Sequence, residues 1–162
     1  MRKISFMIRH IVSFCIVGCG LMTIVPVYAD QPAAFQSKGQ TVYVPVYSHI
    51  YSGDREDPVY LSATLSIRNT DLKQGITITK ADYYDSEGHQ IKSYIEKPMV
   101  LNAISSTRFV IKESDKKGGS GASFIVQWST LKPVNPPLIE SVMISTRSAL
   151  GISFTSRGQV IQ

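Results

Sequence analysis

Alternation of apolar and polar residues is the dominant pattern along this chain. In the segment Tyr60–Asn69 (YLSATLSIRN), every second residue is apolar: Leu61, Ala63, Leu65 and Ile67. A period of two places successive side chains on opposite faces of a β-strand. The segment is therefore predicted to be a strand with one buried face and one solvated face.

Similar short patterns recur along the chain, separated by turns that contain Gly, Pro, Asp and Asn. The further predicted strands are Gln40–Tyr51, a strand from Ile76, Gln90–Ile95, Thr107–Lys112, Ala122–Ser129, Ile139–Thr146 and Ile152–Thr155, and Met99–Leu101 is a short apolar segment. No segment outside the N-terminal apolar run has a helical period. The pattern predicts an all-β protein, an antiparallel β-sandwich of immunoglobulin or fibronectin type with about seven to nine strands.

Four local features refine this prediction. The apolar phase shifts by one residue between Ile78 and Ala81, which predicts a β-bulge near Lys80. Pro45 cannot donate a ladder hydrogen bond, so the first strand is expected at a sheet edge. Asp85–Gly88 has the composition of a hairpin turn, and Gly75 is expected to supply a positive φ. The segment Glu113–Gly121 (ESDKKGGSG) is expected to be a flexible hairpin loop.

The N-terminal segment differs from the rest of the chain. A basic start, an apolar run from Ile11 to Ala29 and small residues at its end are the parts of a secretory signal peptide. Cleavage after Ala29 is favoured. Two alternatives stay open: lipidation of Cys19 in a relaxed lipobox, and retention of the run as a membrane anchor.

These observations predict the domain organisation. Residues 1–29 form the leader, residues 30–39 a flexible lead-in, and residues 40–162 a single β-sandwich domain. Contact with a membrane is expected only through the N-terminal segment, if that segment is retained. The predicted location is the periplasm or cell envelope.

Composition narrows the chemistry of the exported part. Both cysteines, Cys15 and Cys19, lie in the leader, so no disulfide or thiol chemistry is expected after cleavage. Loss of Arg2, Lys3 and Arg9 with the leader lowers the formal net charge from +5 to +2. The remaining Lys and Arg residues are scattered singly, apart from Lys116–Lys117, so nucleic-acid binding is not expected.

Metal chemistry has few candidate ligands. His49, His89, Met99 and Met143 are the soft or borderline ligands left after removal of the leader. An exported copper site of His and Met type is conceivable from these residues, although they have no ligand spacing such as His-x-x-x-His. Four such residues scattered over a sequence are more often surface histidines and core methionines, so no cofactor is predicted.

Tyrosines provide the candidate binding surface. Tyr43, Tyr47 and Tyr51 share one parity if the first strand continues to Tyr51, opposite the face formed by Val42, Val44 and Val46. Exposed tyrosines bind glycans, peptides and proteins, because the ring stacks and the hydroxyl forms hydrogen bonds. The alternative is that these rings cover the rim of the sandwich.

Several blocks together resemble a known family of bacterial exported proteins. The blocks are LSIRNTD, ITKADYYDSEG, KPMVL, GGSGASFIVQW, PLIESVMI and GISFTSRG. The chain is similar over nearly all of Gln40–Ile161 to the domain-of-unknown-function family number 3124. The resemblance implies a bacterial, exported, single-domain protein, and it carries no activity or catalytic residues.

Three functions remain in view. The favoured one is a non-catalytic binding or structural module of the cell envelope, with an envelope protein or a cell-wall component as partner. The second is a periplasmic metal-binding protein. The third is an envelope hydrolase, for which the two histidines His49 and His89 leave few choices of base.

Overall fold

The alternating segments form strands. The computed structural model describes residues 35–146 and 151–162, and the predicted leader with Cys19, like residues 30–34, lies outside them. In these ranges no helix is long and apolar enough to cross a membrane. The described strands are β1 Ser37–Pro45, β2 His49–Ser52, β3 Asp57–Tyr60, β4 Ser62–Arg68, β5 Ile76–Tyr84, β6 Gln90–Ser93, β7 Met99–Leu101, β8 Ser106–Ile111, β9 Ser123–Val134, β10 Leu138–Ser145, β11 Ile152–Arg157 and β12 Gln159–Val160.

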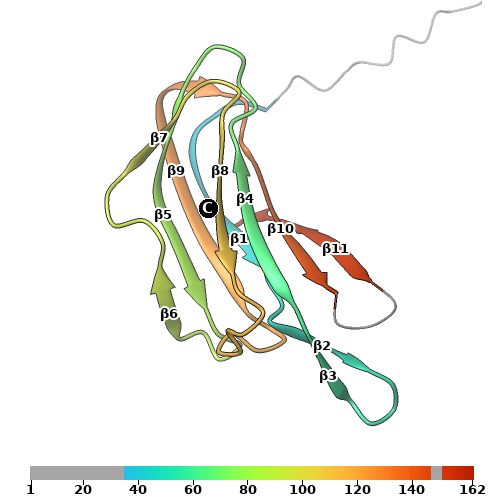
Figure 1. The fold of residues 1–162 in the computed structure, drawn as a ribbon. Helices are drawn as coiled ribbons and strands as arrows, with labels where there is room; N and C mark the ends of the chain where they lie inside the picture. Colours follow the sequence, from blue (N-terminus) through green and yellow to red (C-terminus); the bar gives the residue numbers. More distant parts are fainter. Residues whose placement is uncertain (1–34, 147–150) are drawn as a thin grey trace, which may run out of the picture. The chain divides into compact units, whose positions relative to one another are not determined.

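Two antiparallel sheets and one small hairpin contain all of these strands. The larger sheet has the order β12-β1-β9-β5-β6, with β7 also paired to β5, and the smaller sheet has the order β11-β10-β4-β8. The two sheets face each other, and β2 and β3 form the separate hairpin (Figure 1). After β4 the chain changes sheet five times: between β4 and β5, β7 and β8, β8 and β9, β9 and β10, and β11 and β12. This arrangement confirms the predicted all-β antiparallel sandwich.

The described part contains twelve strands, more than the seven to nine expected. Short strands account for the difference. The predicted strand Gln40–Tyr51 is divided into β1 and β2, β7 corresponds to the short apolar segment Met99–Leu101, and β3 and β12 show no alternation in the sequence.

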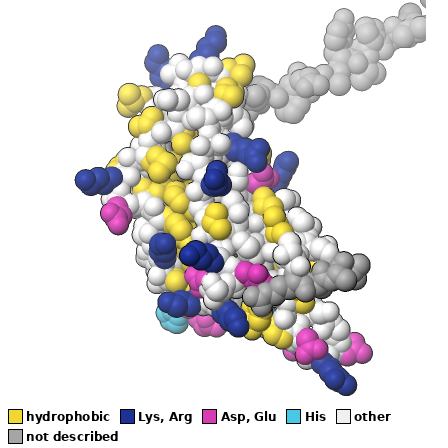
Figure 2. Space-filling view, viewed as in Figure 1, with side chains coloured by type: hydrophobic (Ala, Val, Ile, Leu, Met, Phe, Trp, Pro, Cys, Tyr) yellow, Lys and Arg dark blue, Asp and Glu magenta, His cyan; other side chains and the backbone are white. Residues whose placement is uncertain are grey.

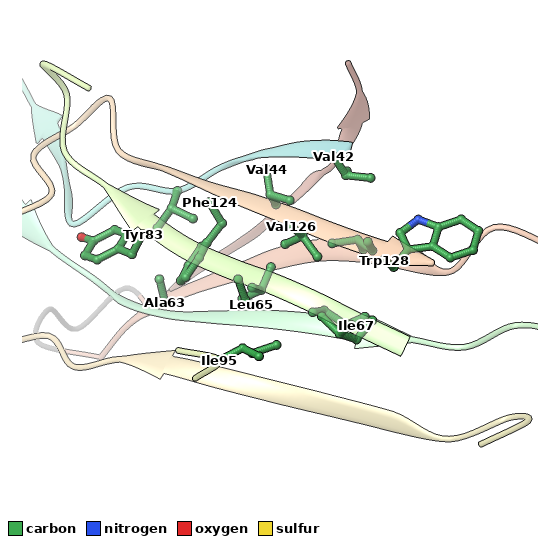
Figure 3. Packing of buried hydrophobic residues seen from close by; sticks show 14 of the residues in the cluster. Val42, Val44, Ala63, Leu65, Ile67, Tyr83, Ile95, Phe124, Val126 and Trp128 are labelled. Carbon is green, nitrogen blue, oxygen red and sulfur yellow. The ribbon is translucent and has the colours of Figure 1, made fainter. Parts of the chain in front are cut away.

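The core lies between the two sheets. Figure 3 shows apolar side chains from β1, β4, β5 and β9 pointing into this layer. All four apolar residues of the Tyr60–Asn69 pattern are at most 1% exposed, as predicted: Leu61, Ala63, Leu65 and Ile67. They meet Phe124, Val126 and Trp128 of β9, and their burial supplies the main favourable contribution to folding.

The predicted bulge in β5 is confirmed. Ile78 pairs with Trp128, and Lys80 pairs with the next residue of β9, Gln127. Thr79 is therefore the additional residue in β5, and its hydroxyl donates a hydrogen bond of 3.3 Å to the carbonyl of Gln127. Ile78 and Ala81 are three positions apart, a spacing that would put them on opposite faces of a regular strand, and the bulge keeps both on the buried face.

The prediction that the first strand lies at a sheet edge is wrong. β1 lies between β9 and β12, and β12 pairs with Val42 and Tyr43. Pro45 is the last residue of β1, and β12 pairs only with Val42 and Tyr43. The backbone N–H that proline lacks is therefore not needed for the hydrogen bonds between β1 and β12. The strand also begins at Ser37, within the predicted lead-in, because Ser37 and Gly39 already pair with β9.

The Asp85–Gly88 turn is confirmed, with a hydrogen bond of 3.2 Å from the Gly88 amide to the Asp85 carbonyl and a φ of 86° at Gly88. Gly75 does not have a positive φ. A Cβ at Gly75 would lie 3.2 Å from the carbonyl oxygen of Leu101, so this glycine serves close packing rather than a turn.

The Gly-rich loop differs from the expected flexible hairpin. It connects β8 and β9, which belong to different sheets. Its backbone is held by hydrogen bonds from the Ser48 amide to the Gly119 carbonyl and from the Ser86 amide to the Gly118 carbonyl. The Ser86 hydroxyl also accepts a hydrogen bond of 3.0 Å from the Gly121 amide. The loop is therefore attached to two other segments of the sandwich.

Candidate functional site

A groove lined by lysines lies where the edges of the two sheets come together. Its walls come from β6 of the larger sheet, β8 of the smaller sheet and the loop after β8. It has a volume of about 380 Å³ and is lined by Lys92, Tyr94, Val110, Ile111, Lys112, Ser114, Asp115, Lys116 and Lys117. We call these residues the lysine groove. In Figure 2, Lys and Arg side chains gather at the lower left of the face, over the region of β6 in Figure 1.

Local strand geometry places Lys92 and Lys112 differently. Lys92 of β6 pairs with the buried Tyr83 and lies on the inner face at the sheet edge. Phe109 and Ile111 of β8 face the core, so Val110 and Lys112 project to the opposite side. After β8 the chain turns, with the Asp115 amide donating a hydrogen bond of 2.9 Å to the Lys112 carbonyl. The Asp115 carboxylate then accepts a hydrogen bond of 3.1 Å from the Lys117 amide. These two bonds hold the loop backbone that carries Lys116 and Lys117.

The floor of the groove is aromatic. The Tyr94 ring packs against Phe109 and Phe124, with ring centroids 5.2 and 5.6 Å away, so the core fixes its position. The ammonium group of Lys92 lies 4.3 Å from the Tyr94 ring centroid, a cation–π contact. Burial raises the pKa of Tyr94 above its usual value, and the nearby Asp115 carboxylate raises it further.

The electrostatics of the groove are strongly positive. Four lysines and one aspartate give it a formal charge of +3. Positive charges gathered in a concavity with apolar walls produce a local potential that attracts anions. The arrangement is suited to binding an anion, and it contains no histidine or cysteine that would act as a base or nucleophile at neutral pH.

An aromatic cluster continues from one end of the groove. The ammonium group of Lys116 lies 4.0 Å from the ring centroid of Tyr60 in β3. The ring centroid of Tyr60 is 6.0 Å from that of His49, which in turn is 5.1 Å from that of Tyr51. The Tyr51 hydroxyl and His49 Nε2 are 3.2 Å apart, within hydrogen-bond distance. We call Tyr60, His49 and Tyr51 the aromatic hairpin.

The three tyrosines expected to form one stripe lie apart. Tyr43 is on β1 and 36% exposed, Tyr47 packs against Phe154 with ring centroids 5.8 Å apart, and Tyr51 is in the hairpin and 55% exposed. The stripe is absent because β1 ends at Pro45, so Tyr51 does not continue its alternation. Tyr51 is connected to the lysine groove by a series of contacts. Its ring contacts His49, the His49 ring contacts Tyr60, and the Tyr60 ring contacts Lys116.

The four candidate metal ligands also lie on separate elements. His49 is in β2, His89 follows the turn after β5, Met99 is in β7, and Met143 is fully buried in β10. Among the described residues, His89 does lie near two carboxylates: its ligand atoms and those of Asp85 and Glu87 are all within 4.8 Å of one another. This group has a structural explanation.

Asp85 caps its own turn. Its carboxylate accepts hydrogen bonds from the Glu87 amide, at 3.0 Å, and the His89 amide, at 2.7 Å. Burial alone would raise the pKa of Asp85, but the hydrogen bonds from His89 and Glu87 outweigh it and lower the pKa. An Asp that satisfies turn amides in this way is ordinary hairpin chemistry.

The lysine groove was not among the sites expected from the sequence. Alternation in Thr107–Lys112 places Lys112 on the face opposite Phe109 and Ile111, so its exposure can be predicted. Lys92 pairs with the buried Tyr83 and lies on the same face of the sheet, at its edge, which alternation within Gln90–Ile95 does not predict. The proximity of the two lysines cannot be predicted either, because β6 and β8 belong to different sheets and no hydrogen-bond ladder connects them. The adjacent pair Lys116–Lys117 was the one signal of local positive charge.

Comparison with known proteins identifies the family of the chain. No match to the chain was found among curated protein sequences. Among solved structures, the chain is similar to one described as "Crystal Structure of Thermotoga maritima 1070", with a TM-score of 0.44, 8% identity, and coverage of 74% of this chain and 92% of that chain. The family model described as "Protein of unknown function (DUF3124)" matches residues 39–161. The match spans the whole sandwich, and the chain therefore belongs to the DUF3124 family.

Proposed function

We propose that this protein is an exported, non-catalytic binding module of the cell envelope that holds an anionic ligand in the lysine groove. The observation that carries this proposal is that Lys92, Lys112, Lys116 and Lys117 line one groove together with Tyr94, whose ring Lys92 contacts. The basic start, apolar run and small-residue exit of residues 1–29 support export. An envelope rich in anionic polymers would supply such ligands.

The physical basis is charge attraction in a partly desolvated site. A lysine ammonium is a compact positive charge with three donors, which pairs with phosphate or carboxylate oxygens. The apolar surfaces of Val110 and the Tyr94 ring lower the local dielectric, so each pair is stronger than on a fully solvated surface. Binding of this kind depends on electrostatics and requires no proton transfer.

Inorganic polyphosphate is a suitable first probe for the full-length chain. We expect the double variant Lys112→Gln/Lys116→Gln to weaken binding by about tenfold, since two charge-assisted contacts are lost. Titration calorimetry at low salt measures the change. Raising the salt should weaken wild-type binding, because the Debye length falls from about 30 Å at 0.01 M to about 10 Å at 0.1 M.

A matched control removes the same charge elsewhere. Lys38 and Lys73 are exposed and do not line the groove, so Lys38→Gln/Lys73→Gln should bind polyphosphate like wild type. Equal losses in the two double variants would show that net charge alone determines binding, and the groove proposal would be wrong.

A further inference from the structure

We propose that the anionic ligand is a glycan, held at the same time by the lysine groove and the aromatic hairpin. This inference rests on the proposed function and adds the chemical class of the ligand. It starts from the contact between Lys116 and Tyr60, which makes the two surfaces continuous. A chain-like ligand that follows this path meets positive charge first and aromatic rings next.

The aromatic hairpin provides a stacking surface. Tyr51 is 55% exposed, and its ring is oriented by an edge contact with His49 and by the 3.2 Å approach of its hydroxyl to His49 Nε2. A tyrosine held in this way presents an apolar ring face and loses little conformational freedom on binding. The C–H face of a sugar ring stacks on such a surface, whereas an inorganic phosphate chain offers nothing apolar to stack.

Asp115 gives a second reason to favour a sugar. Its carboxylate lines the groove among the four lysines and would repel a ligand that carries only negative charge. A carboxylate has several acceptor positions, and one hydrogen bond, from the Lys117 amide, occupies part of that capacity. Sugar hydroxyls can donate to Asp115 while carboxylate or phosphate groups of the same ligand contact the lysines. A ligand that combines hydrogen-bond donors and negative charge therefore fits both Asp115 and the lysines.

The test compares polygalacturonate, a sugar polymer with carboxylates, with inorganic polyphosphate, which has charge alone. Both are titrated into the full-length chain and into the Tyr51→Ala and Tyr51→Phe variants. We expect Tyr51→Ala to weaken polygalacturonate binding by about three- to tenfold and to leave polyphosphate binding unchanged. Tyr51→Phe keeps the ring and should retain most of the polygalacturonate affinity.

The outcomes separate the two proposals. If Tyr51→Ala binds polygalacturonate like wild type, or loses affinity for both polymers equally, the glycan inference is overturned. Binding of polyphosphate without binding of polygalacturonate by the wild type overturns it too. In these cases the proposed function stands as long as Lys112→Gln/Lys116→Gln weakens polyphosphate binding. If the lysine variant binds both polymers like wild type, the proposed function fails and the glycan inference fails with it.

Discussion

At the scale of single residues, Gly118 has the most demanding position in the described part of the chain. A Cβ on Gly118 would lie 1.9 Å from the Tyr83 hydroxyl, 2.7 Å from Ser48 Oγ and 2.8 Å from Ala122 Cβ. Tyr83 is fully buried and within hydrogen-bond distance of Ser48, at 3.0 Å, so it cannot move aside easily. Burial also raises the pKa of Tyr83, as expected for a phenol kept neutral inside the sandwich.

Gly118→Ala should therefore lower the free energy of unfolding by about 1–3 kcal/mol, the usual cost of overpacking. Denaturant unfolding measures this change. Gly151→Ala is the matched control, because a Cβ there meets none of the described residues within 4 Å. In a Tyr83→Phe background the penalty should shrink, since the clashing oxygen is gone. An unchanged penalty in that background would contradict the role assigned to the hydroxyl.

At the scale of elements, the bulge in β5 explains how one strand keeps two apolar phases on the same face. Ile76 and Ile78 precede Thr79, and Ala81 and Tyr83 follow it, yet all four face the core. Removal of Thr79 leaves a regular alternation in which these four residues stay buried. Removal of Thr77 instead places Thr79 in the buried position of Ile78 and turns Ile78 toward solvent.

Deletion of Thr79 should consequently cost about 1 kcal/mol of unfolding free energy, and deletion of Thr77 about 3 kcal/mol or more. Both deletions remove the same residue type from the same strand, so each controls for the other. Chemical unfolding followed by the fluorescence of Trp128, which pairs with Ile78, provides the measurement. Equal losses of unfolding free energy in the two deletions would mean that Thr79 is not the additional residue that shifts the apolar alternation of β5.

The contrast between the bulge and the lysine groove shows how far the sequence alone can lead. A phase shift is visible within the nine residues of β5, because burial alternates locally along one strand. The strand pattern likewise predicts the sandwich. The position of β1 depends on β12, whose two residues carry no pattern of their own. The groove depends on which edges of two sheets come together, which is a property of the whole packing.

At the scale of the whole molecule, the proposed function requires export. The N-terminal pattern of residues 1–29 predicts cleavage after Ala29, with lipidation at Cys19 and membrane retention as the alternatives. These residues lie outside the described ranges, so a measurement of the processed chain has to distinguish cleavage, lipidation and retention.

Expression in a secreting bacterial host, followed by intact-mass measurement, distinguishes them. We expect a chain that begins at Asp30, and we expect Cys19→Ala to be processed identically. A mass that includes lipid on Cys19 would assign the protein to the lipoproteins, and an uncleaved chain in the membrane fraction would assign it to anchored proteins.

The lysines of β6 and β8 have a consequence besides ligand binding. Among the strands of residues 35–146 and 151–162, both lie at the end of their sheets, so each leaves a row of backbone donors and acceptors that no other described strand pairs. Charged side chains on such edges keep two copies of a protein from joining strand to strand. Lys92 of β6 and Lys112, which directly follows β8, place positive charge at these edges and should oppose such pairing by repulsion. A bound polyanion would neutralise that repulsion. We therefore expect copies of the sandwich to associate with one another when several of them bind the same long polymer.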